Sequence, residues 1–539
     1  MRIKTLQLAI GAIFIFLCLA LFYFQVIRSN LYLQLSKNNC IRLIPQEGMR
    51  GRILDRNGEI IVDSRLSFNV LFFPQQNSDI DRILLKLSSV LKIPAEDFKS
   101  KFVKTSRSFF TPVTLAENID KQSAIIIEEL KSELPGVMIQ VAPQRHYPYA
   151  RLAAHLLGYL GEIDHWRLNK LKNYGYESKD IVGYGGIEER YDYYLREEEG
   201  GLQVEVDNRG RIVRVIGLRL PKNGKDIQLT VDLRIQKIIE AALGDRKGAI
   251  IVLDPNNGEV LGMVSFPNFN PALFLRKSSA KLAILKDPDA PLLNRAISGV
   301  YPPGSVFKIV VAISGLETRK IDSATTFFCP GSINLGKQEY ACWNTHGSQN
   351  VVNAIIHSCN VFFYRLGLLT GAENIYDYAI KFGLGSPREI DLPSEPSGFL
   401  PRPLWKRLTQ FKAWFPGDTA NFAIGQGDLL VTPLQITCLL ASIANDGYLT
   451  RPHLIKAIDG RAVRFYKKTA TPLSSNRAVM SLIRSGLEGV VMAPDGTATI
   501  LSIPGVPISG KTGTAQVSRG QPHAWFAGFF PTKKPKFAI

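Results

Sequence analysis

A serine and a lysine stand three residues apart in the segment Tyr301–Lys308, which reads Tyr-Pro-Pro-Gly-Ser-Val-Phe-Lys. The prolines and the glycine end whatever precedes them, and the apolar run that follows predicts a buried helix opened by Ser305. Lys308 lies one helical turn later, so its amine can approach the hydroxyl. A serine becomes a nucleophile when a neighbouring base takes its proton, and burial lowers the pKa of a lysine toward that role. A lone Ser-x-x-Lys pattern in a chain with 65 Lys and Arg residues is also expected by chance.

Two later segments favour the catalytic interpretation. Ser358 and Asn360 follow the helix-like run 351–356 and offer a second hydroxyl and a carboxamide. Further on, Ser509–Gln516 contains Lys511–Thr514, where small residues let a substrate backbone approach a strand edge. The order Ser-x-x-Lys, Ser-x-Asn and Lys-Thr-Gly resembles the motifs of the penicillin-recognising serine acyltransferases.

The whole chain resembles one branch of that family, the class B (monofunctional) penicillin-binding proteins, and most closely the elongation-specific penicillin-binding protein 2. Arg50–Gly58, His155–Gly161 and Gly185–Tyr191 look like motifs of a non-catalytic pedestal domain, and Thr230–Gln236 resembles the entry to a transpeptidase domain. The resemblance implies a peptidoglycan D,D-transpeptidase that cross-links stem peptides during cell-wall elongation through a serine acyl-enzyme, and that is a target of β-lactams.

Several related functions stay open at this point. A division-specific class B transpeptidase shares the motifs, although the sequence Tyr-Pro-Pro-Gly before Ser305 favours the elongation enzyme. A D-alanyl carboxypeptidase differs only in using water as the acceptor, which one chain does not reveal. A β-lactam-binding sensor would signal to the cytoplasm, whereas only residues 1–5 precede the apolar segment. A serine β-lactamase would need neither a pedestal nor a retained anchor.

The resemblance implies roles for eight residues. The catalytic residues are Ser305, Lys308, Ser358, Asn360 and Lys511. The substrate-binding residues are Thr512, Gly513 and Thr514. Ser305 is the acylated nucleophile, and Ser358 relays a proton to the departing D-alanine. The backbone N–H groups of Ser305 and Thr514 would stabilise the oxyanion. Which group acts as the base in acylation is left open.

The first thirty residues predict a membrane anchor. Residues 1–5 form a basic cytoplasmic tip, and residues 6–27 are uncharged and long enough to span a bilayer core of about 30 Å. A cleaved signal peptide would have a shorter apolar region ending at a small-x-small site, whereas this one ends in Phe22-Tyr23-Phe24. We therefore expect a single-pass protein of the cytoplasmic (inner) membrane with its catalytic domain in the periplasm.

The fold class expected for the rest is α+β. Residues 28–222 predict a mixed pedestal domain without a catalytic constellation, and residues 223–539 predict a transpeptidase domain. Its strands form an antiparallel sheet covered by helices, as in the serine β-lactamases. Asp55 and Arg56 suggest an ion pair within a tight turn that ends at Gly58. Lys536–Ile539 reads like the start of a strand, and relatives continue beyond it, so we expect the domain to be incomplete at its C-terminus.

Composition is consistent with this assignment. The chain has 539 residues and a formal net charge of +18, yet it lacks zinc-finger spacing and other nucleic-acid recognition motifs, so no nucleic-acid partner is expected. A basic exterior suits a protein that faces anionic lipid headgroups and wall polymers. Because the chain has no polymerase domain, the resemblance implies two protein partners, a SEDS-family glycosyltransferase and a periplasmic elongation scaffold.

Four residues within one window suggest a metal site: Cys329, Cys342, His346 and Cys359. The Cys-x-x-x-His spacing suits two ligands converging on one ion, and thiolates with an imidazole favour structural zinc. Some elongation-type relatives are understood to bind zinc at corresponding positions, partly through Asp where this chain has Cys. A Cys329–Cys342 disulfide and unlinked thiols are the alternatives in an oxidising compartment. No cofactor is expected for catalysis itself.

Overall fold

The computed structural model describes residues 2–33, 41–72, 79–105, 113–206, 212–275, 279–463, 476–516 and 520–539. These residues form two compact units that interleave along the chain. The first unit contains Met1–Gly51, Asp63–His146 and Tyr194–Lys225, and the second contains Arg52–Val62, Tyr147–Tyr193 and Asp226–Ile539. Because the chain passes several times between the units, the linear boundary at residues 222–223 stays a prediction.

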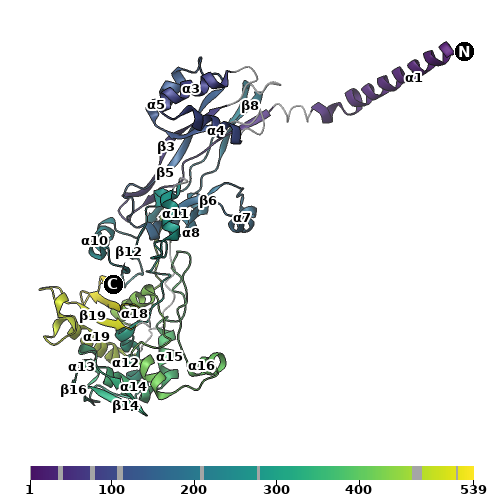
Figure 1. Cartoon of the computed structure of the whole chain (residues 1–539). Helices are drawn as coiled ribbons and strands as arrows, with labels where there is room; N and C mark the ends of the chain where they lie inside the picture. Colours follow the sequence, from purple (N-terminus) through teal and green to yellow (C-terminus); the bar gives the residue numbers. More distant parts are fainter. Residues whose placement is uncertain are drawn as a thin grey trace. The chain divides into compact units, whose positions relative to one another are not determined.

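The N-terminal segment is helical, as its apolar composition predicts. Helix α1 spans Arg2–Phe22, and the π-helical turn η1 (Tyr23–Ile27) continues it (Figure 1). Within it, Leu6–Ile27 is long and apolar enough to cross a membrane, and it is the one such span among the residues that the structure describes. The chain thus carries an N-terminal helix with the properties of a single-pass anchor.

In the first unit, helices pack against an antiparallel sheet. Most of β3 (Ile60–Phe72) pairs with β4 (Val113–Ile119) and β5 (Val137–His146). Helix α4 (Ala95–Thr105) packs against β4 and α5 (Lys121–Glu129) against β5, while α3 (Ile80–Leu91) packs against both of these helices. The apolar core includes Val70, Phe72, Leu84, Leu87, Phe98 and Leu115. A separate sheet has the strand order β1 (Ile41–Gln46), β8 (Gly200–Val206) and β9 (Ile212–Arg219).

The second unit begins with short paired strands. β2 (Ile53–Leu54) runs parallel to β10 (Ile227–Leu229), which pairs antiparallel with β17 (Ile455–Ile458), and β17 with β18 (Arg461–Ala462). The segment 147–193 adds the pair β6 (Tyr159–Glu162) and β7 (Ile181–Tyr184). Its helices are α6 (Ala154–Leu157), α7 (His165–Leu171) and α8 (Gly186–Arg190), with α9 (Asp192–Leu195) at the end of the segment.

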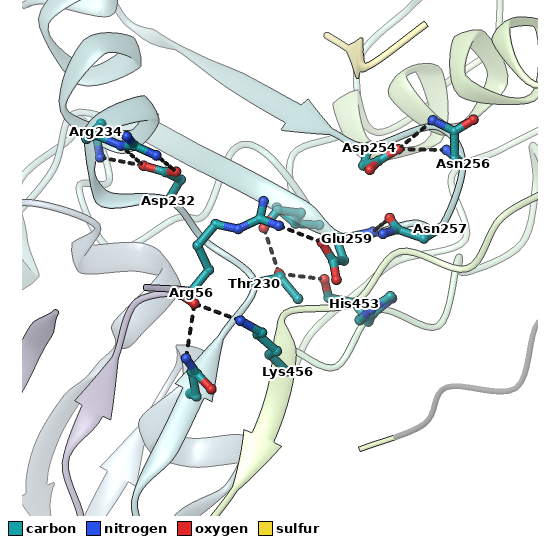
Figure 2. Close-up of polar contacts among 12 residues, drawn as sticks. Arg56, Thr230, Asp232, Arg234, Asp254, Asn256, Asn257, Glu259, His453 and Lys456 are labelled. Carbon is teal, nitrogen blue, oxygen red and sulfur yellow. Dashed lines mark hydrogen bonds and ion pairs between the residues drawn. The ribbon is translucent and has the colours of Figure 1, made fainter. Parts of the chain in front are cut away.

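The turn after β2 corrects one interpretation of the sequence. The buried Asp55 carboxylate accepts hydrogen bonds from the backbone N–H groups of Asn57 (2.7 Å) and Glu59 (2.9 Å), and so closes the expected tight turn. The predicted Asp55–Arg56 ion pair is wrong, since the Arg56 guanidinium instead lies 3.2 Å from Glu259 Oε2 (Figure 2). Backbone donors already occupy Asp55, and Glu259 is brought near by the fold from 203 residues away.

The largest sheet of the second unit is antiparallel, as predicted. Its strand order is β12 (Val260–Phe266), β11 (Gly248–Leu253), β21 (Phe537–Ala538), β20 (His523–Phe530) and β19 (Ser509–Ala515). Helix α10 (Leu233–Leu243) packs against β12 and β11, whereas α18 (Pro433–Ala444) packs against β11, β21 and β20. Among the described residues, strand β19 lies at the edge of this sheet, and an edge strand has backbone groups on one side that no neighbouring strand uses.

Helices next to β19 form the central block (Figure 1). Helix α12 (Lys308–Glu317) is buried from Lys308 to Leu316 because its sequence is apolar all round. It packs against α14 (Asn360–Thr370), α15 (Ala372–Lys381) and α19 (Arg477–Met492), and α19 also contacts α13 (Val351–Ile356) and β19. The second unit also contains η2 (Lys172–Tyr174), η3 (Pro271–Leu275), α11 (Ser279–Lys286), β13 (Phe327–Cys329), β14 (Ser332–Leu335), β15 (Gln338–Ala341), β16 (Gly347–Gln349), α16 (Pro403–Gln410), α17 (Pro416–Ala423) and η5 (Thr499–Leu501).

Candidate active site

Ser305 lies in a tight turn directly before α12. The predicted helix starts as a 3₁₀ turn, η4 (Gly304–Phe307), which places Ser305 half-buried one turn ahead of Lys308. Gly304 has φ 55°, and a Cβ at this position would lie 2.8 Å from the carbonyl oxygen of Thr514. A glycine is therefore required here, because it lets the turn that carries Ser305 pass directly against β19.

The Lys308 amine is buried and held by the Ser-x-Asn segment. Its Nζ donates to the carbonyl oxygen of Ser358 and to Asn360 Oδ1, both at 2.7 Å, and lies 3.3 Å from Ser358 Oγ. Complete burial lowers the pKa of Lys308 from its usual 10.5 to about 8. A fraction of the molecules thus carries a neutral amine near neutral pH, in contact with a hydroxyl.

Ser358 occupies the junction between two helices. His357 ends α13, Cys359 caps the start of α14, and Ser358 between them has φ 53°. Its backbone N–H bonds the carbonyl of Ile355, and that of Cys359 bonds the carbonyl of Ala354. This left-handed conformation is strained for a residue with a side chain, and the two helix ends hold it in place. The result directs the Ser358 hydroxyl toward the Lys308 amine.

Strand β19 supplies the third motif. Lys511 is fully buried, and its Nζ donates to the carbonyl of Thr512 at 3.2 Å. Burial lowers the pKa of Lys511 well below its usual value, and repulsion from Lys308 acts in the same direction. Two buried amines that repel each other favour a state in which one of them is neutral. Thr512 is half-buried and Thr514 is exposed on the free edge of the sheet.

The four predicted metal ligands lie together beside this site. Their ligand atoms are all within 4.8 Å of one another. His346 Nδ1 is 3.5 Å from Cys342 Sγ and 3.7 Å from Cys329 Sγ, and Cys359 is the N-cap of α14. Cys329, Cys342 and Cys359 are free thiols, so the alternative Cys329–Cys342 disulfide is not formed.

The surroundings of Cys342 in this cluster favour its deprotonated thiolate form. A hydrogen bond from the Cys359 thiol, supported by backbone N–H groups, lowers the pKa of Cys342 to about 4. The same contact and burial raise the pKa of Cys359. The backbone N–H of Asn360 points at Cys342 Sγ at 3.2 Å, which ties the cluster to the Ser-x-Asn segment. A bound cation would favour the deprotonated form of each thiol.

Comparison with known proteins decides the family. Residues 248–539 match the model of the penicillin-binding protein transpeptidase domain, and residues 45–229 match the penicillin-binding protein dimerisation domain. The peptidoglycan D,D-transpeptidase MrdA of Acinetobacter baumannii is 34% identical over 96% of this chain and 80% of its own length. The chain belongs to the class B penicillin-binding proteins.

Curated relatives named MrdA and a solved penicillin-binding protein 2 place the chain in the penicillin-binding protein 2 branch. The complex of penicillin-binding protein 2 with MreC from Helicobacter pylori has a TM-score of 0.80 at 30% identity and covers 92% of this chain and 94% of that one. A structure titled for the coordination of polymerization and crosslinking by a peptidoglycan synthase complex has a TM-score of 0.74 at 30% identity, with coverage of 100% and 94%. The family resemblance predicted from the motifs is confirmed, and this penicillin-binding protein is a transpeptidase.

Of the predicted site residues, the structure brings Lys308, Ser358 and Asn360 into direct contact. It places Ser305 one turn away, Lys511 close enough to Lys308 for charge repulsion, and Thr512, Gly513 and Thr514 on the adjoining strand. The segment Asn421–Gly427 also reaches this strand, through a contact of 3.5 Å from Gln426 Nε2 to the Thr514 carbonyl oxygen.

Sequence reasoning did not select Thr497 or Asp495. Thr497 Oγ1 lies 2.9 Å from Thr512 Oγ1, and Asp495 Oδ2 lies 2.8 Å from His357 Nε2. The only signal in the sequence is the short turn Pro494-Asp495-Gly496 after a helical run. That signal predicts a turn, but it does not indicate which motif the turn would meet.

Proposed function

We propose that this transpeptidase cross-links peptidoglycan stem peptides during cell-wall elongation, through an acyl-enzyme on Ser305. The observation that carries the proposal is the contact of a buried Lys308 amine with both polar residues of the Ser-x-Asn segment, one turn after Ser305. Relatives named peptidoglycan D,D-transpeptidase align over nearly the whole chain, which supports the same substrate here.

In the first half-reaction, the Ser305 hydroxyl attacks the carbonyl carbon of the bond between the two terminal D-alanines. A neutral Lys308 takes the hydroxyl proton, and the oxyanion accepts from the backbone N–H groups of Ser305 and Thr514. Collapse breaks the C–N bond. The departing D-alanine amine receives its proton through Ser358, which regains one from the lysine, and an ester on Ser305 remains.

In the second half-reaction, the amine of another stem peptide attacks this ester. The new amide is the cross-link, and the proton lost by the amine returns to Ser305 through the same Lys308–Ser358 contact. Asn360 holds Lys308 in place throughout. β-Lactams offer a strained amide in the same position and leave a slowly hydrolysed ester on Ser305.

The free edge of β19 is the proposed substrate platform. A stem peptide can add to an edge strand through main-chain hydrogen bonds. Thr512 and Thr514 offer hydroxyls to the terminal carboxylate, and Gly513 leaves room for the substrate backbone. Lys511 completes the site electrostatically, as a buried amine close enough to Lys308 for charge repulsion.

We further propose that the Cys329–Cys342–His346–Cys359 cluster holds zinc. Tetrahedral bond lengths of about 2.3 Å to sulfur and 2.0 Å to nitrogen place ligand atoms about 3.5–3.8 Å apart, and the two His346 Nδ1 distances are 3.5 and 3.7 Å. These two distances match this ion, and all four ligand atoms lie within 4.8 Å of one another, near enough to close on it. Bound zinc would cross-link the segments that carry these four residues. Because Cys359 lies between Ser358 and Asn360, its bond to zinc would fix the backbone of both.

The N-terminal helix is proposed to anchor the protein in the inner membrane with the catalytic unit in the periplasm, since basic residues precede the apolar span. A SEDS-family glycosyltransferase and a periplasmic elongation scaffold are the proposed partners. Similarity to a protein solved in complex with MreC and to a peptidoglycan synthase complex supports both.

A reconstituted reaction tests the function. The full-length protein is incubated with lipid-linked precursor and a partner polymerase, and the products are digested and analysed by mass spectrometry. Cross-linked dimers that are absent with Ser305→Ala support the proposal. Release of D-alanine without dimers would favour the carboxypeptidase alternative. Acylation by penicillin without turnover of precursor would favour a sensor.

A further inference from the structure

The loop between α19 and β19 contacts the Lys-Thr-Gly motif and the residue that precedes the Ser-x-Asn motif. At one end, Asp495 Oδ2 is 2.8 Å from Nε2 of His357, the residue that precedes Ser358. At the other end, Thr497 Oγ1 is 2.9 Å from Thr512 Oγ1 in the Lys-Thr-Gly strand. Three consecutive residues thus bridge segments that are 155 positions apart in the chain (512 − 357).

His357 is fixed on several sides. Gln349 Nε2 donates to the carbonyls of His346 (2.9 Å) and Ser348 (3.1 Å), which leaves its Oε1 to accept from His357 Nδ1 at 2.8 Å. The His357 ring also stacks on that of His346, with centroids 5.7 Å apart and planes within 3°. Asp495 therefore binds to a ring whose orientation is already set.

The loop itself is held closely against the end of α19. The backbone N–H of Gly496 bonds the carbonyl of Ala493, and that of Ala498 bonds the carbonyl of Val490 at 2.9 Å. A Cβ on Gly496 would lie 2.5 Å from the carbonyl oxygens of Gly489 and Val490, so only glycine fits. Thr497 is consequently presented to β19 by a rigid turn.

A bound substrate carboxylate fixes which hydroxyl donates in the contact between Thr497 and Thr512. A carboxylate only accepts hydrogen bonds, so Thr512 must give its single O–H to it. The Thr512 oxygen can then accept the O–H of Thr497 while its own proton is engaged. Such a chain polarises each hydroxyl and strengthens the bond to the carboxylate.

We propose that the Asp495–Thr497 turn is a positioning element, in which His357 anchors Asp495 and the Thr497 hydroxyl orients that of Thr512 toward the terminal carboxylate of the substrate. This inference rests on the proposed role of Thr512 in carboxylate binding. It adds Thr497, Asp495 and His357 to the residues that act on substrate selection, each through another group rather than by touching the substrate.

The test compares acylation of the full-length protein by benzylpenicillin and by its methyl ester, which lacks the carboxylate charge. The rate of Ser305 acylation is followed by intact-mass spectrometry over a range of concentrations, so that binding and acylation separate. Thr497→Val keeps the shape but removes the hydroxyl. It should weaken binding of benzylpenicillin about tenfold, leave the limiting acylation rate within about twofold, and barely affect the ester.

Matched variants distinguish positioning from packing. Thr497→Ser retains the hydroxyl donor and should restore the preference for benzylpenicillin over its methyl ester. Thr499→Val, at an exposed position on the same loop, should behave as wild type. Asp495→Ala should act in the same direction as Thr497→Val but more weakly, since the Asp495 side chain is 69% exposed. Asp495→Asn keeps an acceptor for His357 and should lie closer to wild type.

The variant Thr512→Val distinguishes the positioning role of Thr497 from the carboxylate-binding role of Thr512 on which it rests. If Thr512→Val leaves discrimination intact, the carboxylate assignment of Thr512 is wrong and the inference fails with it. If Thr512→Val removes discrimination while Thr497→Val does not, only the positioning role is overturned. Equal slowing of both compounds by Thr497→Val would show a merely structural contact and would also overturn it.

Discussion

The Nζ atom of Lys308 lies 2.7 Å from Oδ1 of Asn360, at the start of a neighbouring helix. A second acceptor, the carbonyl oxygen of Ser358, is at the same distance. A neutral amine has two N–H donors, and these two acceptors occupy both of them. The lone pair is then directed toward a third partner, which makes the amine a base for a hydroxyl and leaves it no freedom to turn away.

Replacing Ser305 with Ala should abolish covalent labelling by fluorescent penicillin, because no other hydroxyl is placed at the turn before Lys308. The measurement is in-gel fluorescence of the full-length protein, with circular dichroism to show that the fold is retained. Ser323→Ala, at an exposed position after α12, is the matched control and should label normally. Persistent labelling of Ser305→Ala would contradict the assignment of the nucleophile.

Acylation should accelerate as the pH rises through about 8, the pKa to which burial lowers that of Lys308. The sign follows from the base role. Below this pH the amine is protonated and cannot accept the Ser305 proton, and above it the neutral form dominates. The rate constant for penicillin acylation, measured from pH 6 to 10, should rise to a plateau. A flat profile over that range would exclude Lys308 as the titrating base.

Replacing Asn360 with Asp should shift this pH dependence of acylation. A carboxylate beside the amine stabilises the cation and should move the midpoint upward by at least about one pH unit. The rate at neutral pH should then fall, while the plateau at high pH changes less. An unchanged midpoint would show that the observed titration belongs to another group.

Much of the local structure follows from short-range signals in the sequence. α3, α10 and α13 begin where Asp79, Asp232 and Asn350 accept a backbone N–H at the N-cap, and apolar periodicity sets the buried face. α5 ends at Glu129, six residues before Pro135 (135 − 129). Pro135 disfavours helical conformation in the residue before it, and the intervening residues form turns instead.

Of the candidate site, only the residues within the three motifs could be predicted from the sequence. The three motifs identify Lys308, Ser358, Asn360 and Lys511 by residue type and order, and family resemblance supplies their proposed roles. The Arg56–Glu259 and His357–Asp495 pairs join residues 203 and 138 positions apart. Charge patterning along the chain carries no information on such pairs, because tertiary packing alone brings them together.

The Asp55 carboxylate supports the turn after β2 and should be important for stability. It accepts from the backbone N–H groups of Asn57, Glu59 and Leu233, at 2.7, 2.9 and 3.3 Å. Asp55→Ala would leave the buried Leu233 N–H and the partly buried donors of Asn57 and Glu59 without their partner and should cost about 2–4 kcal/mol. Differential scanning calorimetry should show a lower unfolding temperature for Asp55→Ala and a smaller change for Asp55→Asn, which keeps one acceptor. Equal stability of Asp55→Ala and wild type would contradict this role.

Protein purified without chelator should contain about one zinc ion per chain, because three thiols and an imidazole converge within 4.8 Å. His346→Ala should reduce the zinc content to background by elemental analysis, and His165→Ala, at an exposed position on α7, should not. Cys359 is both a proposed ligand and the N-cap of α14, so metal loss should also disturb Ser358 and Asn360. We therefore expect a strong chelator to lower the unfolding temperature and slow acylation by penicillin together, with both restored by added zinc. Retention of full zinc content in His346→Ala would show that the ion is bound elsewhere, and a protein that contains no metal before any chelation would refute the site.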